Sequence, residues 1–158
     1  MGRREADLYS EADLQNAIRL CIIEGDFTLH SGQRSNWICD LFQVWSTGWF
    51  SRFILALDSS YPLVGVEFGG AVLALCSNRS CGLIRKDGTY IPHWSRPKEV
   101  SLVDDVVTTE SSLAEASIAL DVLGVQVKEY LCVLDRREPG TEILEVRSLA
   151  KIWNCRTI

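Results

Sequence analysis

Short apolar runs and periodic apolar stripes alternate along this chain. Runs of β-branched and aliphatic residues, bounded by turn residues, predict short buried strands. These expected strands are Leu63–Val66, Gly82–Arg85, Val100–Val103 and Glu129–Leu134. Apolar residues three and four positions apart predict helices between them. The expected helices run from Ser10 to Gly25, from Thr47 to Leu57, from Gly69 to Cys76, and from Ser112 to Gly124 with an apolar stripe that includes Leu113 and Ile118.

Three other segments have weaker patterns. Phe27 to Phe42 alternates apolar positions with turn residues, which predicts a hairpin or a strand–loop–strand. Lys86 to Lys98 is polar and contains prolines, which predicts a loop, and Ile143 to Ile152 predicts a last short strand or helix. Strands that alternate with helices indicate an α/β fold, with a central, mainly parallel sheet flanked by helices. No internal linker divides residues 1–158, so we expect a single domain.

Composition and charge narrow the class of protein. A chain of 158 residues with 47% hydrophobic residues is typical of a globular domain. The net charge of −5 argues against nucleic-acid binding through a broad basic face. No apolar run approaches the ~20 residues of a membrane span, and the N-terminus lacks the apolar core of a signal peptide. Six cysteines without C-x-x-C spacing predict buried free thiols and a cytoplasmic location.

The most informative stretch begins with the strand Val100–Val103, which is followed by Asp104, Asp105 and a hydroxyl-rich turn. In open α/β sheets, ligands bind at the carboxyl ends of the strands, and a helix N-terminus offers free N–H groups to an anion. Two acids beside such an anion-binding helix N-terminus indicate a sugar phosphate. The acids would bind its hydroxyls or a Mg²⁺ ion. Paired acids also occur as helix caps and in receiver-type Mg²⁺ domains. A receiver domain, however, would have the pair after its first strand.

The same stretch resembles the phosphoribosyl-diphosphate motif of type I phosphoribosyltransferases, in which two acids precede Thr-x-Gly-x-Thr/Ser. Further segments resemble orotate phosphoribosyltransferases and occur in the order of that family, over roughly residues 10 to 152. Phe27–Ser35 resembles the signature Phe-x-Leu-x-Ser-Gly-x-x-Ser, and Trp37–Asp40 follows at the position of an aromatic-rich strand. Val66–Ala71 stands at the pyrophosphate loop, Ile84–Lys86 at the Arg-Lys before the mobile loop, and Val133–Gly140 at the Asp-Arg-x-x-Gly segment.

The resemblance implies roles for individual residues in transfer of ribose 5-phosphate from phosphoribosyl diphosphate to orotate or a related base. It places Asp104 and Asp105 on the ribose hydroxyls, directly or through Mg²⁺-bound water. It also makes both of them catalytic, together with Lys86. The remaining implied substrate-binding residues are Gly69, Gly70 and Arg85 for pyrophosphate, Thr108, Thr109 and Ser112 for the 5-phosphate, and His30 and Arg136 for the base. For Arg136 the alternative is a surface ion pair with Asp135 or Glu138.

The resemblance also implies a small hood built from the N-terminal segment and the C-terminal tail. It implies a homodimer as well, whose interface could include the aromatic residues Trp45, Trp49, Trp94 and Trp153. The expected partners are phosphoribosyl diphosphate and a nucleobase, and neither a nucleic acid nor a membrane.

Three positions differ from the family pattern. Glu110 replaces a glycine, and a carboxylate there would repel a phosphate by about 4 kcal/mol per charge pair at 4 Å unless it points outward or pairs with a cation. On this basis a Glu110→Gly change is expected to tighten phosphoribosyl-diphosphate binding.

The mobile loop is short and lacks its lysine, for which His93 or Arg96 could substitute, and His30 stands where a lysine often contacts the base. An alternative function is therefore a catalytically weakened protein of the same fold that senses a nucleotide or phosphoribosyl diphosphate.

Overall fold

The computed structural model describes residues 10–29, 32–93 and 97–153. Its helices are α1 (Glu11–Arg19), the 3₁₀ helix η2 (Leu41–Thr47), α2 (Trp49–Leu57), α3 (Glu67–Cys76) and α4 (Ser111–Val122). Its strands are β1 (Ile22–Thr28), β2 (Arg34–Cys39), β3 (Leu63–Val66), β4 (Ser80–Ile84), β5 (Tyr90–Pro92), β6 (Glu99–Val107), β7 (Gln126–Asp135) and β8 (Val146–Lys151).

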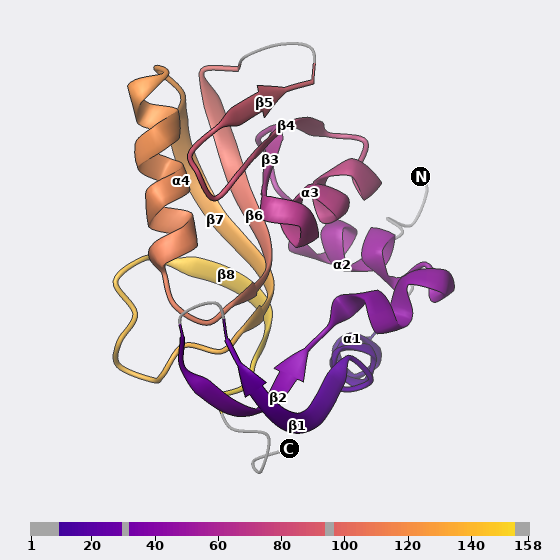
Figure 1. Ribbon diagram of the computed structural model, residues 1–158. Coiled ribbons are helices and arrows are strands. Elements are labelled where there is room, and N and C mark those ends of the chain that lie inside the picture. Colours follow the sequence, from indigo (N-terminus) through magenta and orange to yellow (C-terminus); the bar gives the residue numbers. More distant parts are fainter. Residues whose placement is uncertain (1–9, 30–31, 94–96, 154–158) are drawn as a thin grey trace, which may run out of the picture.

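A six-stranded sheet with the order β5-β4-β3-β6-β7-β8 forms the centre of the molecule. Its strands pair in parallel except for β5, which is antiparallel to β4. Helices α2 and α3 lie on one side of the sheet and α4 lies on the other (Figure 1). One buried cluster joins α1, α2 and α3 to the sheet, and a second joins α4 to it. The expected α/β architecture with a mainly parallel sheet is confirmed.

The N-terminal helix is shorter than its pattern predicts. Ser10 and Asp13 form a reciprocal capping box at its start, as the sequence indicates. The helix ends at Arg19, however, because β1 begins at Ile22 and pairs with β2. Gly25 therefore lies inside a strand, at an irregularity in the β1–β2 register, and does not end the helix. Strand pairing has overridden the local helical pattern.

The β1–β2 hairpin forms a separate two-stranded sheet beside the main one, as Figure 1 shows. This is the expected hood, but among the described residues only its N-terminal part is built as predicted. The tail contributes β8 to the main sheet, where it pairs in parallel with β7. Helix α1 is tied to this strand, because the Gln15 side-chain amide donates to the Leu149 carbonyl at 2.9 Å.

The segment expected to be a loop, residues 86 to 98, contains β5. A turn closes the hairpin, with the Gly88 N–H donating to the Arg85 carbonyl at 2.8 Å and Gly88 at a positive φ of 80°. Pro92 suggested a loop, but β5 is an edge strand. Proline is tolerated there, because its missing N–H need not pair with a neighbouring strand.

Two further boundaries differ from the prediction. β6 continues to Val107, so Asp104 and Asp105 lie within the strand and not beyond its end. In α4, Leu113, Ala116 and Leu120 are buried, whereas Ile118, assigned to the same stripe, is 67% exposed.

The described cysteines Cys21, Cys39, Cys76, Cys81 and Cys132 are free thiols, and Cys155 lies outside the described residues. Within the described ranges, no helix is both long and apolar enough to span a membrane.

Candidate functional site

The two acids of β6 lie in the middle of the sheet, against the first turn of α3. A Cβ on Gly69 would overlap the Asp105 carboxylate, and a Cβ on Gly70 would overlap the Val103 carbonyl oxygen. Glycine at both positions therefore lets the helix approach the acidic strand. Burial, with a further contribution from neighbouring Asp105, raises the pKa of Asp104 well above its ordinary value. Such a carboxyl group ionises more readily when hydrogen-bond donors or a cation reach it.

The two glycines lie in the first turn of α3 and not in a loop before it, which corrects the expected glycine turn. Helix N-termini leave backbone N–H groups without partners inside the helix, so this turn still presents donors suited to an anion. Glu67, the first residue of α3, has a positive φ of 54°, which is a strained conformation for a residue with a side chain. The segment that the sequence assigned to pyrophosphate is therefore a helix start with a strained first residue.

Arg85 and Lys86 follow the end of β4 and are both exposed. They line a small pocket together with Glu67 from α3 and Ser112 from α4. Two cations thus lie between the first turns of two helices, α3 and α4. This arrangement brings Arg85 and Lys86, which the sequence assigned to pyrophosphate, next to Ser112, which it assigned to the 5-phosphate.

The expected 5-phosphate residues surround the start of α4. Thr108 is partly buried and lines a separate cavity of about 310 Å³. Thr109 is exposed, and its hydroxyl donates to the Ser111 hydroxyl at 3.3 Å. Four hydroxyl groups, of Thr108, Thr109, Ser111 and Ser112, therefore lie at the N-terminus of α4.

Arg136 lines the same 310 Å³ cavity as Thr108 and is only 7% exposed. Its guanidinium carbon lies 3.4 Å from the centroid of the Trp37 ring, and its Nη2 donates to the Ser35 hydroxyl at 3.1 Å. Arg136 is thus buried and not at the surface, and the neighbouring Asp135 is bound by Arg137.

Arg137 is buried in a network of carboxylates. Its Nε and Nη2 donate to the two oxygens of Asp135 at 2.9 and 2.7 Å, and its Nη1 donates to Glu110 and to the Leu144 carbonyl. The Glu110 carboxylate also accepts the N–H groups of Ile143 and Leu144 at 2.7 and 2.9 Å. Glu110 is thus paired with a cation, which is the condition under which a carboxylate can stand next to a phosphate loop.

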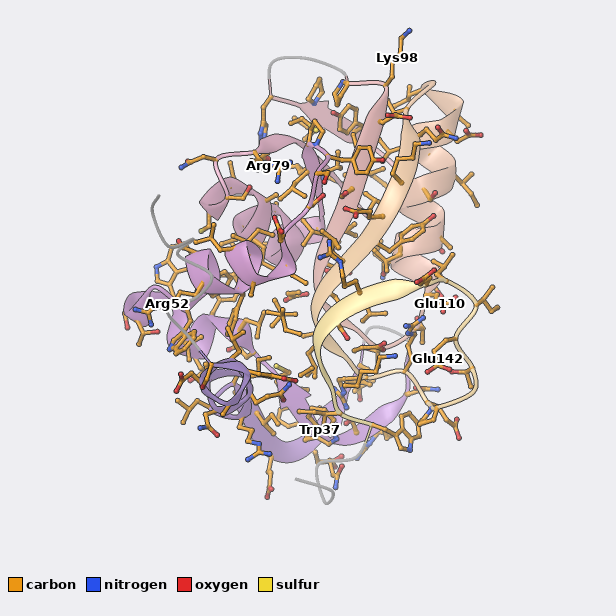
Figure 2. The ribbon with its side chains drawn as sticks, turned by 180° about the vertical axis from the view of Figure 1, so that it is seen from behind. Trp37, Arg52, Arg79, Lys98, Glu110 and Glu142 are labelled. Carbon is orange, nitrogen blue, oxygen red and sulfur yellow. The ribbon has the colours of Figure 1, made fainter. Side chains whose placement is uncertain are left out.

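These contacts set the pKa of Glu110. Burial alone would raise the pKa, but the Leu144 and Ile143 N–H groups and the Arg137 guanidinium outweigh it and lower the pKa below its ordinary value. Glu110 is therefore ionised at neutral pH. Figure 2 shows Glu110 on the same side of the molecule as Glu142, which lies in the segment connecting β7 to β8.

Sequence reasoning missed Ser35, Trp37 and Arg137 as individual contributors to the site. Only the position of Trp37 in the aromatic-rich segment gave a signal, because the partner of Ser35 and Trp37, Arg136, lies about a hundred positions away in the chain. His30 and Arg96 lie outside the described residues. His93 is described, and its Nδ1 lies 3.0 Å from the Ser80 hydroxyl at the sheet edge.

The donor set at β6 suits a hard cation. Within the described ranges, no cluster of three or more His, Cys, Asp or Glu side chains is arranged for a metal ion. Asp104 and Asp105 still offer adjacent carboxylate oxygens, which fit Mg²⁺ when phosphate oxygens and water complete its octahedron.

Comparison with known proteins identifies the family. No protein-family model matches the chain. An orotate phosphoribosyltransferase of Thermoplasma volcanium is 31% identical over 139 residues, which cover 77% of this chain and 81% of the relative. The orotate phosphoribosyltransferase of Methanocella arvoryzae is 33% identical over 150 residues, covering 80% and 85%. The crystal structure of orotate phosphoribosyltransferase from Aeropyrum pernix superposes with a TM-score of 0.69 at 25% identity, covering 87% of this chain and 93% of that one. The chain belongs to the orotate phosphoribosyltransferase family.

Proposed function

We propose that the chain transfers ribose 5-phosphate from phosphoribosyl diphosphate to a ring nitrogen of orotate. The observation that carries this proposal is the cavity in which Arg136 lies beside Thr108. A guanidinium group pre-oriented on Trp37 suits the carboxylate of an anionic base, and the adjacent turn suits a phosphate. One cavity therefore offers a group for the base and a group for the 5-phosphate of the nucleotide that the reaction forms.

In this proposal, different residues at the sheet bind different parts of the substrates. The ring nitrogen of orotate forms a bond to the anomeric carbon as the bond from that carbon to pyrophosphate breaks, with inversion, and the proton of that nitrogen is released to solvent. Asp104 and Asp105 bind the ribose hydroxyls and favour the positive charge that develops on the ribose ring. The first turn of α3, with Arg85 and Lys86, neutralises the departing pyrophosphate, and Thr108, Thr109 and Ser112 bind the 5-phosphate. Catalysis then rests on positioning and on electrostatic stabilisation of the leaving group.

A Mg²⁺ ion is part of this proposal. The carboxylates of Asp104 and Asp105 would bind it, together with oxygens of phosphoribosyl diphosphate. Its chemistry would be to neutralise charge on the pyrophosphate oxygens. The raised pKa of Asp104 supports such a site, because a neighbouring cation favours the ionised form that burial disfavours.

The test is turnover with a panel of bases. Purified protein, Mg²⁺ and phosphoribosyl diphosphate are incubated with orotate, uracil, nicotinate or adenine, and the loss of each base is followed. We expect conversion of orotate and at least tenfold slower conversion of uracil, because uracil lacks the carboxylate that Arg136 would bind. Binding of phosphoribosyl diphosphate without turnover of any base would instead support the nucleotide-sensing alternative.

We also propose that two copies of the chain associate through an aromatic face formed by η2, α2 and α3. Phe42, Trp45 and Phe68 are 36, 53 and 72% exposed, and Phe42 lies 5.4 Å from Phe68 between ring centroids. An exposed aromatic cluster of this kind is typical of a protein interface. Trp49 is half-buried, Trp153 lines the Arg136 cavity, and Trp94 lies outside the described residues, so the proposed face differs from the one expected from the sequence.

The five described cysteines are all free thiols, and this supports the proposal of a cytoplasmic location.

A further inference from the structure

Glu110 occupies a position that joins two parts of the site. It directly precedes Ser111, the first residue of α4, and directly follows Thr109. Its side chain makes no capping hydrogen bond to its own helix. The carboxylate instead reaches the segment between β7 and β8, where Arg137, Ile143 and Leu144 donate to one oxygen, Oε1. The side chain thus bridges the start of α4 and the end of β7.

A second contact fixes the other side of the same turn. The N–H of Arg136 donates to the carbonyl of Val107 at 2.7 Å. The two contacts, Arg136 to Val107 and Arg137 to Glu110, therefore hold the residues on either side of Thr108 and Thr109. We call this pair of contacts the bracket. Each of them starts from the pair of arginines at the end of β7.

The bracket is buried at its Arg137 end. The side chains of Arg137 and Asp135 are 3 and 2% exposed, and they form two hydrogen bonds to each other. Glu110 itself is 14% exposed at its side chain. Hydrogen bonds to ionised groups shielded from water are stronger and more directional than those at the surface. The position of the Thr108–Thr109 turn is consequently set by the same residues that set the position of Arg136.

We propose that Glu110 is a positioning residue that fixes the phosphate-binding turn Thr108–Thr109 relative to the base-binding Arg136. This inference rests on the proposed function, since it assigns the two ends of the nucleotide to these groups. It reverses the expectation from sequence that Glu110→Gly would tighten phosphoribosyl-diphosphate binding. Ligands that reach both groups at once need the bracket, whereas ligands that reach only Arg136 do not.

The test compares two ligands on Glu110→Gly and Glu110→Gln. Orotidine 5′-monophosphate spans the turn and Arg136, while orotate reaches only Arg136, and calorimetry gives the Kd of each. We expect Glu110→Gly to weaken the nucleotide about tenfold, the equivalent of one charge-assisted hydrogen bond, and to change orotate less than twofold. Glu110→Gln should lie between, because its amide oxygen can still accept the two backbone N–H groups. Glu145→Gln, at an exposed glutamate of the same segment, is the matched control and should change neither Kd.

Two results would overturn the proposal. Tighter or unchanged nucleotide binding by Glu110→Gly would show that the carboxylate does not position the turn. Equal weakening of nucleotide and orotate would assign Glu110 a merely structural role.

Hydrogen exchange separates this inference from the proposed function. In the ligand-free protein, Glu110→Gly should speed exchange at the amides of Ile143 and Leu144, whatever the chain catalyses. Faster exchange with no nucleotide binding by the wild type would mean that the proposed function has failed although the bracket exists. Unchanged exchange would mean that the bracket itself is absent.

Discussion

The carboxyl group of Asp104, in the candidate site, lowers the stability of the fold at neutral pH. Burial, and then Asp105, raises its pKa, so the folded chain binds this proton more tightly than the unfolded chain. Stability contributed by the protonated form is complete below the unfolded pKa of about 3.9 and is lost as the pH rises toward the folded pKa. At neutral pH, where this carboxyl group is ionised in the unfolded chain, its burial is therefore a cost to folding.

We accordingly expect Asp104→Asn to unfold at the same or a higher temperature than the wild type at pH 7. The difference should vanish near pH 4, because wild-type Asp104 is then protonated too. The same change should weaken phosphoribosyl-diphosphate binding about 10- to 100-fold, through loss of charge-assisted hydrogen bonds of ~1.5–3 kcal/mol. Thermal unfolding at the two pH values and calorimetry measure these effects. A variant that is less stable at pH 7 and binds normally would contradict both the burial cost and the ribose assignment.

At the scale of elements, the β1–β2 hairpin supports the end of β7. Trp37 of β2 is 2% exposed, and its ring face covers the Arg136 guanidinium. A desolvated cation–π contact of this kind contributes about 1–2 kcal/mol, which corresponds to roughly 5- to 30-fold in binding.

Trp37→Leu should therefore raise the KM for orotate roughly 5- to 30-fold, since it removes the ring that orients Arg136. Trp37→Phe keeps an aromatic face and should raise this KM less. Steady-state rates with orotate varied at saturating phosphoribosyl diphosphate give both values, and the KM for phosphoribosyl diphosphate serves as the internal control. Equal orotate KM values for the two folded variants would show that the ring face does not orient Arg136.

The elements also show why some parts of the fold were predictable. β3, β6, β7 and α4 have local patterns that their tertiary contacts reinforce, so their existence could be predicted. β5 could not, because an edge strand containing Pro92 looks like a loop until β4 is placed beside it. The extent of α1 was wrong for a similar reason, since pairing with β2 begins at Ile22.

At the scale of the whole molecule, the order of short motifs predicted the family better than any single residue did. Asp104, Asp105 and Arg136 could be proposed as site residues because each follows an apolar run, and the carboxyl ends of parallel strands meet at one edge of the sheet. The orientation of Glu110 was not predictable, because its partners Ile143 and Leu144 lie more than thirty positions away in a segment of no clear pattern.

The aromatic face leads to a prediction about assembly. Replacing Trp45 and Phe68 together by serine should convert a dimer into a monomer, because it removes two of the three exposed rings of the proposed interface. Light scattering at micromolar concentration measures the mass of both proteins, and circular dichroism checks that the variant is folded. A wild-type monomer, or a variant that remains dimeric, would rule out this interface.

The central claim is that this chain is an active transferase in which Arg136 selects an anionic base. The most direct measurement follows orotate consumption and pyrophosphate release together, for the wild type and for Arg136→Ala. We predict one pyrophosphate per orotate for the wild type, and for Arg136→Ala a loss of at least tenfold in kcat/KM for orotate with little change for uracil. Pyrophosphate release without orotate consumption, or an unchanged preference for orotate over uracil in Arg136→Ala, would contradict the account.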